Sequence, residues 1–256
     1  MINTASRWSA NDYARHAAFV PELGHAVLEM LGAKPGELIL DVGCGDGALT
    51  QMIAQAGANV IGLDASVEMV EAARARGVDA FVADAEAMDL ARFGQFDAVF
   101  SNAALHWMLD PDAVASGVFR ALRAGGRFVG EMGGAGNLAR LRQGVRDELI
   151  ERGYAMPERD PAWYAAPEEF RRLYLIAGFE AIETELIERP TPLPDGVAEW
   201  VKTFRSGLFD VAMVPEWERD AVAAAVEARL APALRQADGG WFADYVRLRF
   251  SMRKPG

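Results

Sequence analysis

Short apolar runs alternate with amphipathic stretches from about residue 20 to residue 132. The runs are almost continuously apolar, which is typical of strands buried on both faces of a parallel sheet; they are 38–41, 60–64, 80–83, 96–101 and 126–131. Residues 66–76 and 111–123 carry apolar side chains three and four apart, which predicts helices. Their expected N-caps and glycine stops are Ser66, Asp110, Gly77 and Gly125. This alternation predicts an α/β fold with a doubly wound, mostly parallel sheet.

The pattern changes after residue 132, where helical segments run to about residue 178. Residues 179–188 and 241–252 then alternate between apolar and polar side chains. Such alternation predicts two antiparallel strands, which we expect to close one edge of the sheet. Between them, 195–206 and 215–236 read as helices, so a helical cap is expected as an insertion between the last two strands.

Composition narrows the class of protein. The 256 residues carry a net charge of −11 and a single cysteine, and 51% of them are apolar. One cysteine allows no intrachain disulfide, and the negative charge disfavours a nucleic-acid groove, which needs clustered cations. The sequence shows no secretory signal and no membrane-spanning stretch, so we expect a cytoplasmic protein that acts on a small molecule. No spacing of ligands predicts a metal site, and the oligomeric state stays open.

The sharpest local feature is the run Leu-Asp-Val-Gly-Cys-Gly-Asp-Gly-Ala at 40–48, where the first strand turns into a helix. Gly43 and Gly45 allow a ligand to approach the backbone closely, and the helix start offers free N–H groups. Taken alone, the run also fits the G-x-G-x-x-A form of a dinucleotide fingerprint. An NAD-dependent oxidoreductase is therefore one reading of this turn.

Polar residues end the next three strands. Asp64 suits the hydroxyls of a ribose, or it could cap the following helix. Asp84 could accept a hydrogen bond from an exocyclic amine such as that of adenine, or it could simply begin a loop. Asn102 ends the fourth strand and is followed by His106 and Trp107. These positions mark the carboxyl edge, where open α/β sheets bind ligands.

These motifs resemble the S-adenosylmethionine-dependent methyltransferases of the Rossmann-like type. The resemblance covers residues 8–132 and rests on the glycine turn, Gly-Leu-Asp-Ala-Ser at 62–66, the Asp84 turn and Phe-Asp-Ala-Val-Phe-Ser-Asn at 96–102. The run at 102–107 and the tail at 243–250 are closer to the branch of trans-aconitate methyltransferases and malonyl-carrier-protein O-methyltransferases. That branch commonly has glutamine where this chain has His106.

The resemblance implies that S-adenosylmethionine is the cofactor. Its methionine portion would pass Gly43 and Gly45, with its amino group held by Asp41, while Asp64 would bind the ribose. The resemblance implies cofactor contacts at Tyr13, Asp41, Gly43, Cys44, Gly45, Asp64, Ala65, Met69, Asp84, Ala85 and Asn102. Cys44 is expected to be a small buried filler of the turn and not a nucleophile.

His106 is the candidate catalytic residue, as a base or a substrate contact, because it follows a strand at the carboxyl edge and an unperturbed imidazole titrates near neutral pH; a structural role is the alternative. Trp8, Tyr13 and Trp107 are the other candidate substrate contacts, although Trp8 and Tyr13 could be core aromatics. Trp163 and Tyr164 are expected to pack in an apolar cap.

We therefore expect methyl transfer to a small molecule, to a carboxylate or to a phenol or enol oxygen. The alternatives are an NAD-dependent oxidoreductase and a non-catalytic module that binds S-adenosylmethionine. The expected layout is a single methyltransferase domain over 1–256, comprising N-terminal lid helices at 1–30, a cofactor-binding core at 31–132 and a cap insertion at 190–238.

Overall fold

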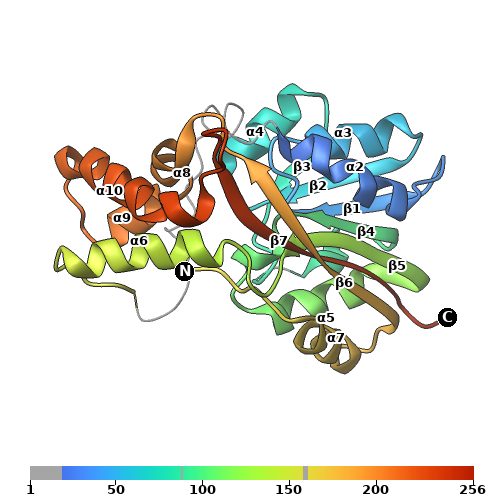
Figure 1. Cartoon of the computed structure of the whole chain (residues 1–256). Coiled ribbons are helices and arrows are strands. Elements are labelled where there is room, and N and C mark those ends of the chain that lie inside the picture. The colour runs from blue at the N-terminus through green and yellow to red at the C-terminus, as the bar shows by residue number, and fades with distance from the viewer. Residues whose placement is uncertain (1–18, 88, 158–160) are drawn as a thin grey trace. The chain divides into compact units, whose positions relative to one another are not determined.

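The computed structural model describes residues 19–87, 89–157 and 161–256. These residues form a seven-stranded sheet in the order β3-β2-β1-β4-β5-β7-β6 (Figure 1). The strands are β1 (Leu38–Val42), β2 (Asn59–Asp64), β3 (Asp79–Val82), β4 (Phe96–Asn102), β5 (Leu122–Gly133), β6 (Glu180–Pro192) and β7 (Phe242–Arg253). The first five strands pair in parallel and β7 runs antiparallel to β5. The expected doubly wound, mostly parallel sheet is confirmed.

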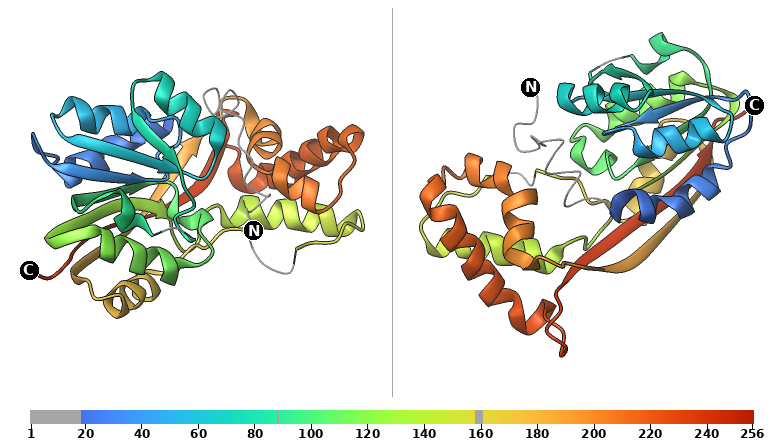
Figure 2. Two further views of the ribbon diagram at one scale, coloured as in Figure 1. Left: turned by 180° about the vertical axis from the view of Figure 1, so that it is seen from behind. Right: turned by 90° about the horizontal axis from the view of Figure 1, so that it is seen from above.

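Helices cover both faces of this sheet (Figures 1 and 2). They are α2 (Phe19–Leu31), α3 (Ala48–Gln55), α4 (Val67–Ala75), α5 (Pro111–Ala121) and α7 (Pro167–Ile176), with short 3-10 turns η2 (Leu90–Phe93) and η3 (Leu105–Trp107). One core cluster joins α5 and α7 to one face of the sheet. A second joins α2 and α3 to the opposite face, so the central strands are buried on both sides, as their continuous apolar runs predict.

The helix boundaries follow local side-chain chemistry. Ser66 accepts a hydrogen bond from the Met69 amide and Asp110 accepts one from the Ala113 amide, so both expected N-caps are confirmed. The expected stop at Gly125 is wrong, because α5 already ends at Ala121. Leu122 is fully buried and pairs with Phe96 of β4, so the gain from joining the sheet ends the helix early.

The chain divides into two compact units, here called the sheet unit and the helical unit. Among the described residues, the sheet unit comprises 19–87, 89–135, 162–187 and 247–256, and the helical unit comprises 136–157, 161 and 188–246. The helical unit contains α6 (Ala139–Glu151), α8 (Gly196–Phe204), α9 (Ser206–Val211) and α10 (Glu216–Leu234). The helices expected between the last two strands are present as α8 and α10, and α9 is an additional short helix between them.

The helical unit has its own packed interior and its own ion pairs. Gly144 of α6 lies so close to Leu230 of α10 that a methyl group on it would come within 2.9 Å of the leucine side chain. Glu148, which is 8% exposed, forms ion pairs with Arg152 and Arg229. Close backbone approach and paired charges therefore join α6 to α10.

The two ends of the segment between β6 and β7 are joined by hydrogen bonds. The Leu193 amide donates a hydrogen bond of 2.8 Å to the Trp241 carbonyl, and Arg235 forms a β-bridge with Trp241. Residues 194–240 thus leave and rejoin the chain at neighbouring points. Within the part of the chain that the structure describes, no helix is both long and apolar enough to cross a membrane.

Candidate cofactor and acceptor site

The glycine turn between β1 and α3 is held by its backbone. The amides of Gly43 and Cys44 both donate to the Leu63 carbonyl, at 2.7 and 2.9 Å. Gly43 has a φ of 75°, and a Cβ there would lie 2.2 Å from the Cβ of Ala104. Gly45 has a φ of 55°, and a Cβ there would meet nothing within 4 Å. Gly43 therefore allows the η3 loop to approach, while Gly45 borders open space that a ligand could occupy.

Asp64 ties the end of β2 to the glycine turn. One carboxylate oxygen accepts the Gly45 amide at 3.0 Å and the other accepts the Ser66 amide at 2.9 Å. Burial raises the pKa of this carboxyl above its ordinary value, against the effect of the backbone hydrogen bonds, which lower it. Each oxygen can still accept one further hydrogen bond, so Asp64 is held in place and can receive ligand hydroxyls.

Asp41 is a buried acid in β1 with an exposed fraction of 2%. Its Oδ2 accepts the hydroxyl of Thr50 at 2.6 Å. Burial raises the pKa of Asp41 to about 7, and the Thr50 bond, which lowers it, and the nearby Asp64 charge, which raises it, have smaller effects. A cationic group beside Asp41 would favour its ionised form. The partnership with Thr50 was missed by sequence reasoning, although a small polar residue on the buried face of α3 is a usable signal.

Cys44 is 8% exposed, and burial raises the pKa of its thiol well above the ordinary range. The thiol packs so closely on Gly62 that a Cβ on that glycine would lie 2.9 Å from the sulfur. A thiol with a raised pKa is a poor nucleophile. The interpretation of Cys44 as a buried filler agrees with this environment.

The other predicted cofactor residues lie at or after the same strand ends. The Ala83 amide donates to the Asp64 carbonyl at 2.9 Å, which joins the ends of β2 and β3. Asp84 follows directly and accepts the Glu86 amide at 2.9 Å, an Asx turn that leaves its second oxygen for another donor. Met69 and Ala85 are buried, whereas Ala65 is exposed. Asn102 ends β4, which lies beside β1 in the sheet.

The carboxyl edge of the sheet therefore gathers three acids and an open glycine turn. Asp41, Asp64 and Asp84 follow one another across the neighbouring strands β1, β2 and β3. A buried carboxyl with a raised pKa suits an ammonium group, and carboxylate oxygens suit hydroxyl and amine donors. The arrangement can therefore receive a ligand that carries hydrogen-bond donors and a positive charge.

His106 lies in η3 and is 4% exposed. Its Nδ1 accepts the Gly133 amide at 3.2 Å, and its carbonyl accepts the Trp163 amide at 2.8 Å. Its ring stacks on Tyr164, with centroids 5.6 Å apart, and contacts Trp107 at 4.8 Å. Because Nδ1 accepts a hydrogen bond, the neutral ring carries its proton on Nε2.

The structure places Trp163 and Tyr164 in the sheet unit, with Tyr164 stacked on His106, and not in the apolar cap that the sequence predicts for them. The Trp163 side chain stacks on Phe170 of α7, with centroids 6.2 Å apart. The pairing could not be read from the sequence, because almost sixty residues separate His106 from Tyr164.

A buried ion pair lies beyond Asn102 in the sheet. Glu131 of β5 is 3% exposed and accepts two hydrogen bonds from Arg249 of β7, at 3.0 and 2.8 Å. The two residues stand opposite each other in the antiparallel ladder, and Glu131 also pairs with Asn102 of β4. Sequence reasoning found the alternation of β7 but not this pair, because register across strands is not visible in one strand.

Trp8 and Tyr13 lie outside the described residues. The first part of the expected N-terminal lid, residues 1–18, lies there as well. Their roles as substrate or cofactor contacts stay predictions. The remaining candidates, His106 and Trp107, are on η3, directly after β4.

Comparison with known proteins identifies the family. A family model described as a methyltransferase domain matches residues 40–130. The chain is 36% identical to an uncharacterised methyltransferase of Schizosaccharomyces pombe, over 96% of this chain and 98% of that protein. It is 30% identical to trans-aconitate 2-methyltransferase of Rhodococcus jostii, over 94% of this chain and 97% of that protein.

Solved structures share the fold. The phosphoethanolamine N-methyltransferase 2 of Haemonchus contortus, in complex with S-adenosylhomocysteine, superposes with a TM-score of 0.57 at 22% identity. The match covers 92% of this chain and 53% of that one. The relatives that match nearly the whole chain show that it belongs to the S-adenosylmethionine-dependent methyltransferases.

Proposed function

We propose that the protein methylates a carboxylate oxygen of a small-molecule acceptor and so forms a methyl ester. The observation that supports this proposal most directly is the hydrogen bond from the Gly133 amide to His106 Nδ1. A base needs a lone pair that can take a proton, but the Gly133 amide occupies the lone pair on Nδ1, so the neutral ring carries its proton on Nε2. A hydrogen-bond donor suits an acceptor that is already ionised. The Rhodococcus relative is a trans-aconitate 2-methyltransferase, and trans-aconitate is a carboxylate.

The residues of the carboxyl edge would hold the cofactor. S-adenosylmethionine supplies a methyl group on a positively charged sulfur, which an acceptor oxygen can take in one displacement. Asp41 would receive the ammonium group, Asp64 the ribose hydroxyls and Asp84 the adenine amine. The remaining contacts would come from Gly43, Cys44, Gly45, Ala65, Met69, Ala85 and Asn102. The burial of Cys44, Met69 and Ala85 and the open space at Gly45 support this assignment.

The work of the protein is then mostly geometric. A carboxylate is ionised at neutral pH, so no proton has to be removed from it during the reaction. His106 Nε2–H would orient one carboxylate oxygen, and stacking on Tyr164 would fix the plane of the imidazole. Trp107 would line the acceptor pocket. Good alignment of reacting groups can lower a barrier by roughly 7–11 kcal/mol.

Replacement of His106 separates the donor role from the base role. His106→Gln keeps an N–H donor, so kcat/KM should stay within about tenfold of the parent. His106→Phe removes the donor and should lower kcat/KM by about 10- to 100-fold, the effect of one hydrogen bond to a charged group. Steady-state kinetics checks both variants. Calorimetry with S-adenosylhomocysteine should give unchanged affinity in each.

The contrary result is equally clear. A glutamine variant as inactive as the phenylalanine variant, with both folded by circular dichroism, would mean that His106 acts as a base. The acceptor would then be a phenol or an enol, the other oxygen nucleophiles considered for this site.

Asp41 predicts a pH dependence of cofactor binding. Its pKa of about 7 means that the unliganded protein holds a proton there at lower pH. An ammonium group favours the ionised carboxylate, so the proton must leave on binding and affinity must fall as pH falls below 7. We expect S-adenosylhomocysteine to bind about tenfold more weakly at pH 6 than at pH 8. The Asp41→Asn variant should bind S-adenosylhomocysteine weakly, and its affinity should not depend on pH in this range. An unchanged pH dependence in that variant would refute the role of Asp41.

A panel of acceptors tests the overall proposal. The protein is incubated with S-adenosylmethionine and, separately, with tricarboxylates, dicarboxylates, phenols and amines, and products are detected by mass spectrometry. A methyl ester releases methanol on mild alkaline treatment, whereas a methyl ether or methylamine does not. Alkali-stable products would replace the carboxylate proposal. If the protein binds S-adenosylhomocysteine tightly but methylates none of these acceptors, the alternative of a non-catalytic module that binds S-adenosylmethionine would be favoured.

A further inference from the structure

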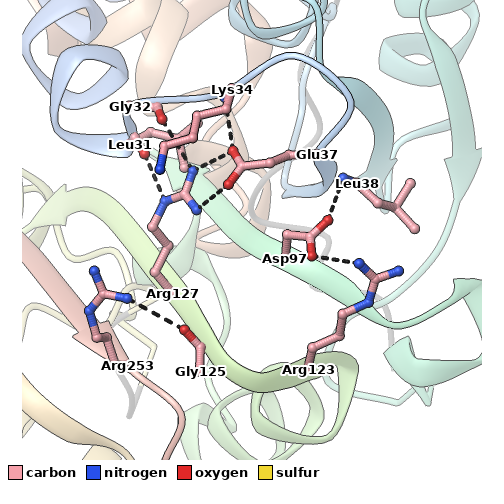
Figure 3. Close-up of polar contacts among 10 residues, drawn as sticks. All are labelled: Leu31, Gly32, Lys34, Glu37, Leu38, Asp97, Arg123, Gly125, Arg127 and Arg253. Atoms are coloured by element: carbon pink, nitrogen blue, oxygen red, sulfur yellow. Dashed lines mark hydrogen bonds and ion pairs between the residues drawn. The ribbon is translucent and has the colours of Figure 1, made fainter. Parts of the chain in front are cut away.

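A cavity lies at the amino edge of the sheet, at the other end of the strands from the glycine turn. It has a volume of about 480 Å³, within the range of small-molecule pockets. It is bordered by the end of α2, the starts of β1 and β4, the first residues of β5 and the end of β7 (Figure 3). Its ionisable lining residues are Lys34, Glu37, Asp97, Arg123, Arg127 and Arg253.

Both acids of this cavity are already paired. Glu37 accepts two hydrogen bonds from Arg127, at 2.8 and 2.7 Å, and the same guanidinium donates to the Leu31 carbonyl at the end of α2. Asp97 accepts the Leu38 amide at 2.8 Å and pairs with Arg123. The Arg127 bond holds the pKa of Glu37 below its ordinary value, so this pair stays ionised and internally neutral.

Two positive charges remain after this pairing. Among the described residues, neither the Lys34 ammonium nor the Arg253 guanidinium forms an ion pair with a carboxylate, although the Lys34 backbone amide donates to Glu37 at 2.9 Å. Both side chains are exposed at the cavity. Arg253 makes only a long contact of 3.4 Å with the Gly125 carbonyl. The four cations and two acids of the lining give a surplus of two positive charges, in a chain whose net charge is −11. A local surplus of opposite sign to the whole protein attracts anions.

We propose that this cavity binds a small phosphorylated molecule. A phosphate monoester carries about two negative charges near neutral pH, which matches the surplus. The Arg253 guanidinium presents a planar fork of donors suited to phosphate oxygens, and the Lys34 ammonium adds a compact charge. Arg123 uses one of its N–H groups on Asp97 and keeps others that can reach a bound anion. The site would lie at the opposite strand ends from the methyl-transfer site.

The experiment measures binding of inorganic phosphate to the full chain at constant ionic strength, by NMR shifts of the Gly125 and Gly126 amides. Lys34→Gln/Arg253→Gln removes the two unpaired charges and should weaken the phosphate affinity at least tenfold. Arg146→Gln/Arg172→Gln removes two charges from exposed positions on α6 and α7 and should leave that affinity within twofold. Affinity for S-adenosylhomocysteine should not change in either double variant.

Three results would overturn the proposal. The first is no saturable shift of the two glycine amides with phosphate. The second is an equal loss of affinity in both double variants, which would mean a response to net charge alone. The third is malonate binding as tightly as phosphate, since a dicarboxylate lacks the tetrahedral oxygens that this proposal requires.

Discussion

Gly43→Ala should destabilise the protein by about 2–5 kcal/mol and abolish detectable binding of S-adenosylhomocysteine. A φ of 75° costs an L-residue roughly 1–2 kcal/mol, and a Cβ only 2.2 Å from the Ala104 Cβ must displace η3 or the turn, which typically costs a further 1–3 kcal/mol. Displacement of η3 would also move His106. Denaturant unfolding followed by calorimetry with S-adenosylhomocysteine measures both effects.

Gly45→Ala is the matched control within the same turn. Its φ of 55° carries the same backbone penalty, but its new methyl group would meet no protein atom within 4 Å. Only about 1–2 kcal/mol of stability should be lost. Because the methyl group enters the space proposed for the cofactor, affinity for S-adenosylhomocysteine should still fall at least tenfold. Equal destabilisation by both variants would show that the contact with Ala104 does not set the turn.

Arg249→Met should cost about 3–5 kcal/mol of stability, because it removes the guanidinium that donates two hydrogen bonds to Oε2 of the buried Glu131 carboxylate. The ion pair between Arg123 and Asp97 offers a comparison on the same sheet. The Arg123 side chain is 50% exposed, so Arg123→Met should cost no more than about 1 kcal/mol. Chemical denaturation of the three proteins under one set of conditions gives the difference.

A double variant separates charge from packing at this position. Glu131→Met/Arg249→Met removes both charges and fills the space with apolar side chains, and such replacements are often neutral or stabilising. We expect it to recover most of the stability lost in Arg249→Met. A double variant as unstable as the single one would assign the loss to side-chain packing instead of to the broken ion pair.

The sequence predicts the sheet well because its signal is local. Strands buried on both faces must be apolar along their length, and each of the five runs in residues 38–131 became a strand. The end of α5 was misplaced because local glycine chemistry at Gly125 lost to the burial of Leu122, a long-range effect. The short helix α9 has no strong periodic signal and was not anticipated.

The candidate site divides in the same way. Asp41, Asp64 and Asp84 could be found because parallel strands bring their carboxyl ends to one edge, so order along the chain becomes position in space. Tyr164 and the pair of Glu131 with Arg249 depend on contacts between segments far apart or on register between strands. The tautomer of His106 depends on one backbone amide that follows it by twenty-seven residues.

The hydrogen bond that joins the two ends of the segment between β6 and β7 also affects how the protein can evolve. The bond between Leu193 and Trp241 brings the two ends of residues 194–240 together, and β6 and β7 are neighbours in the sheet. Insertions, deletions or exchange of this segment therefore need not change the order of the strands. Lineages that descend from a common ancestor can remodel these forty-odd residues while keeping the glycine turn, so we expect differences in length among relatives to concentrate there.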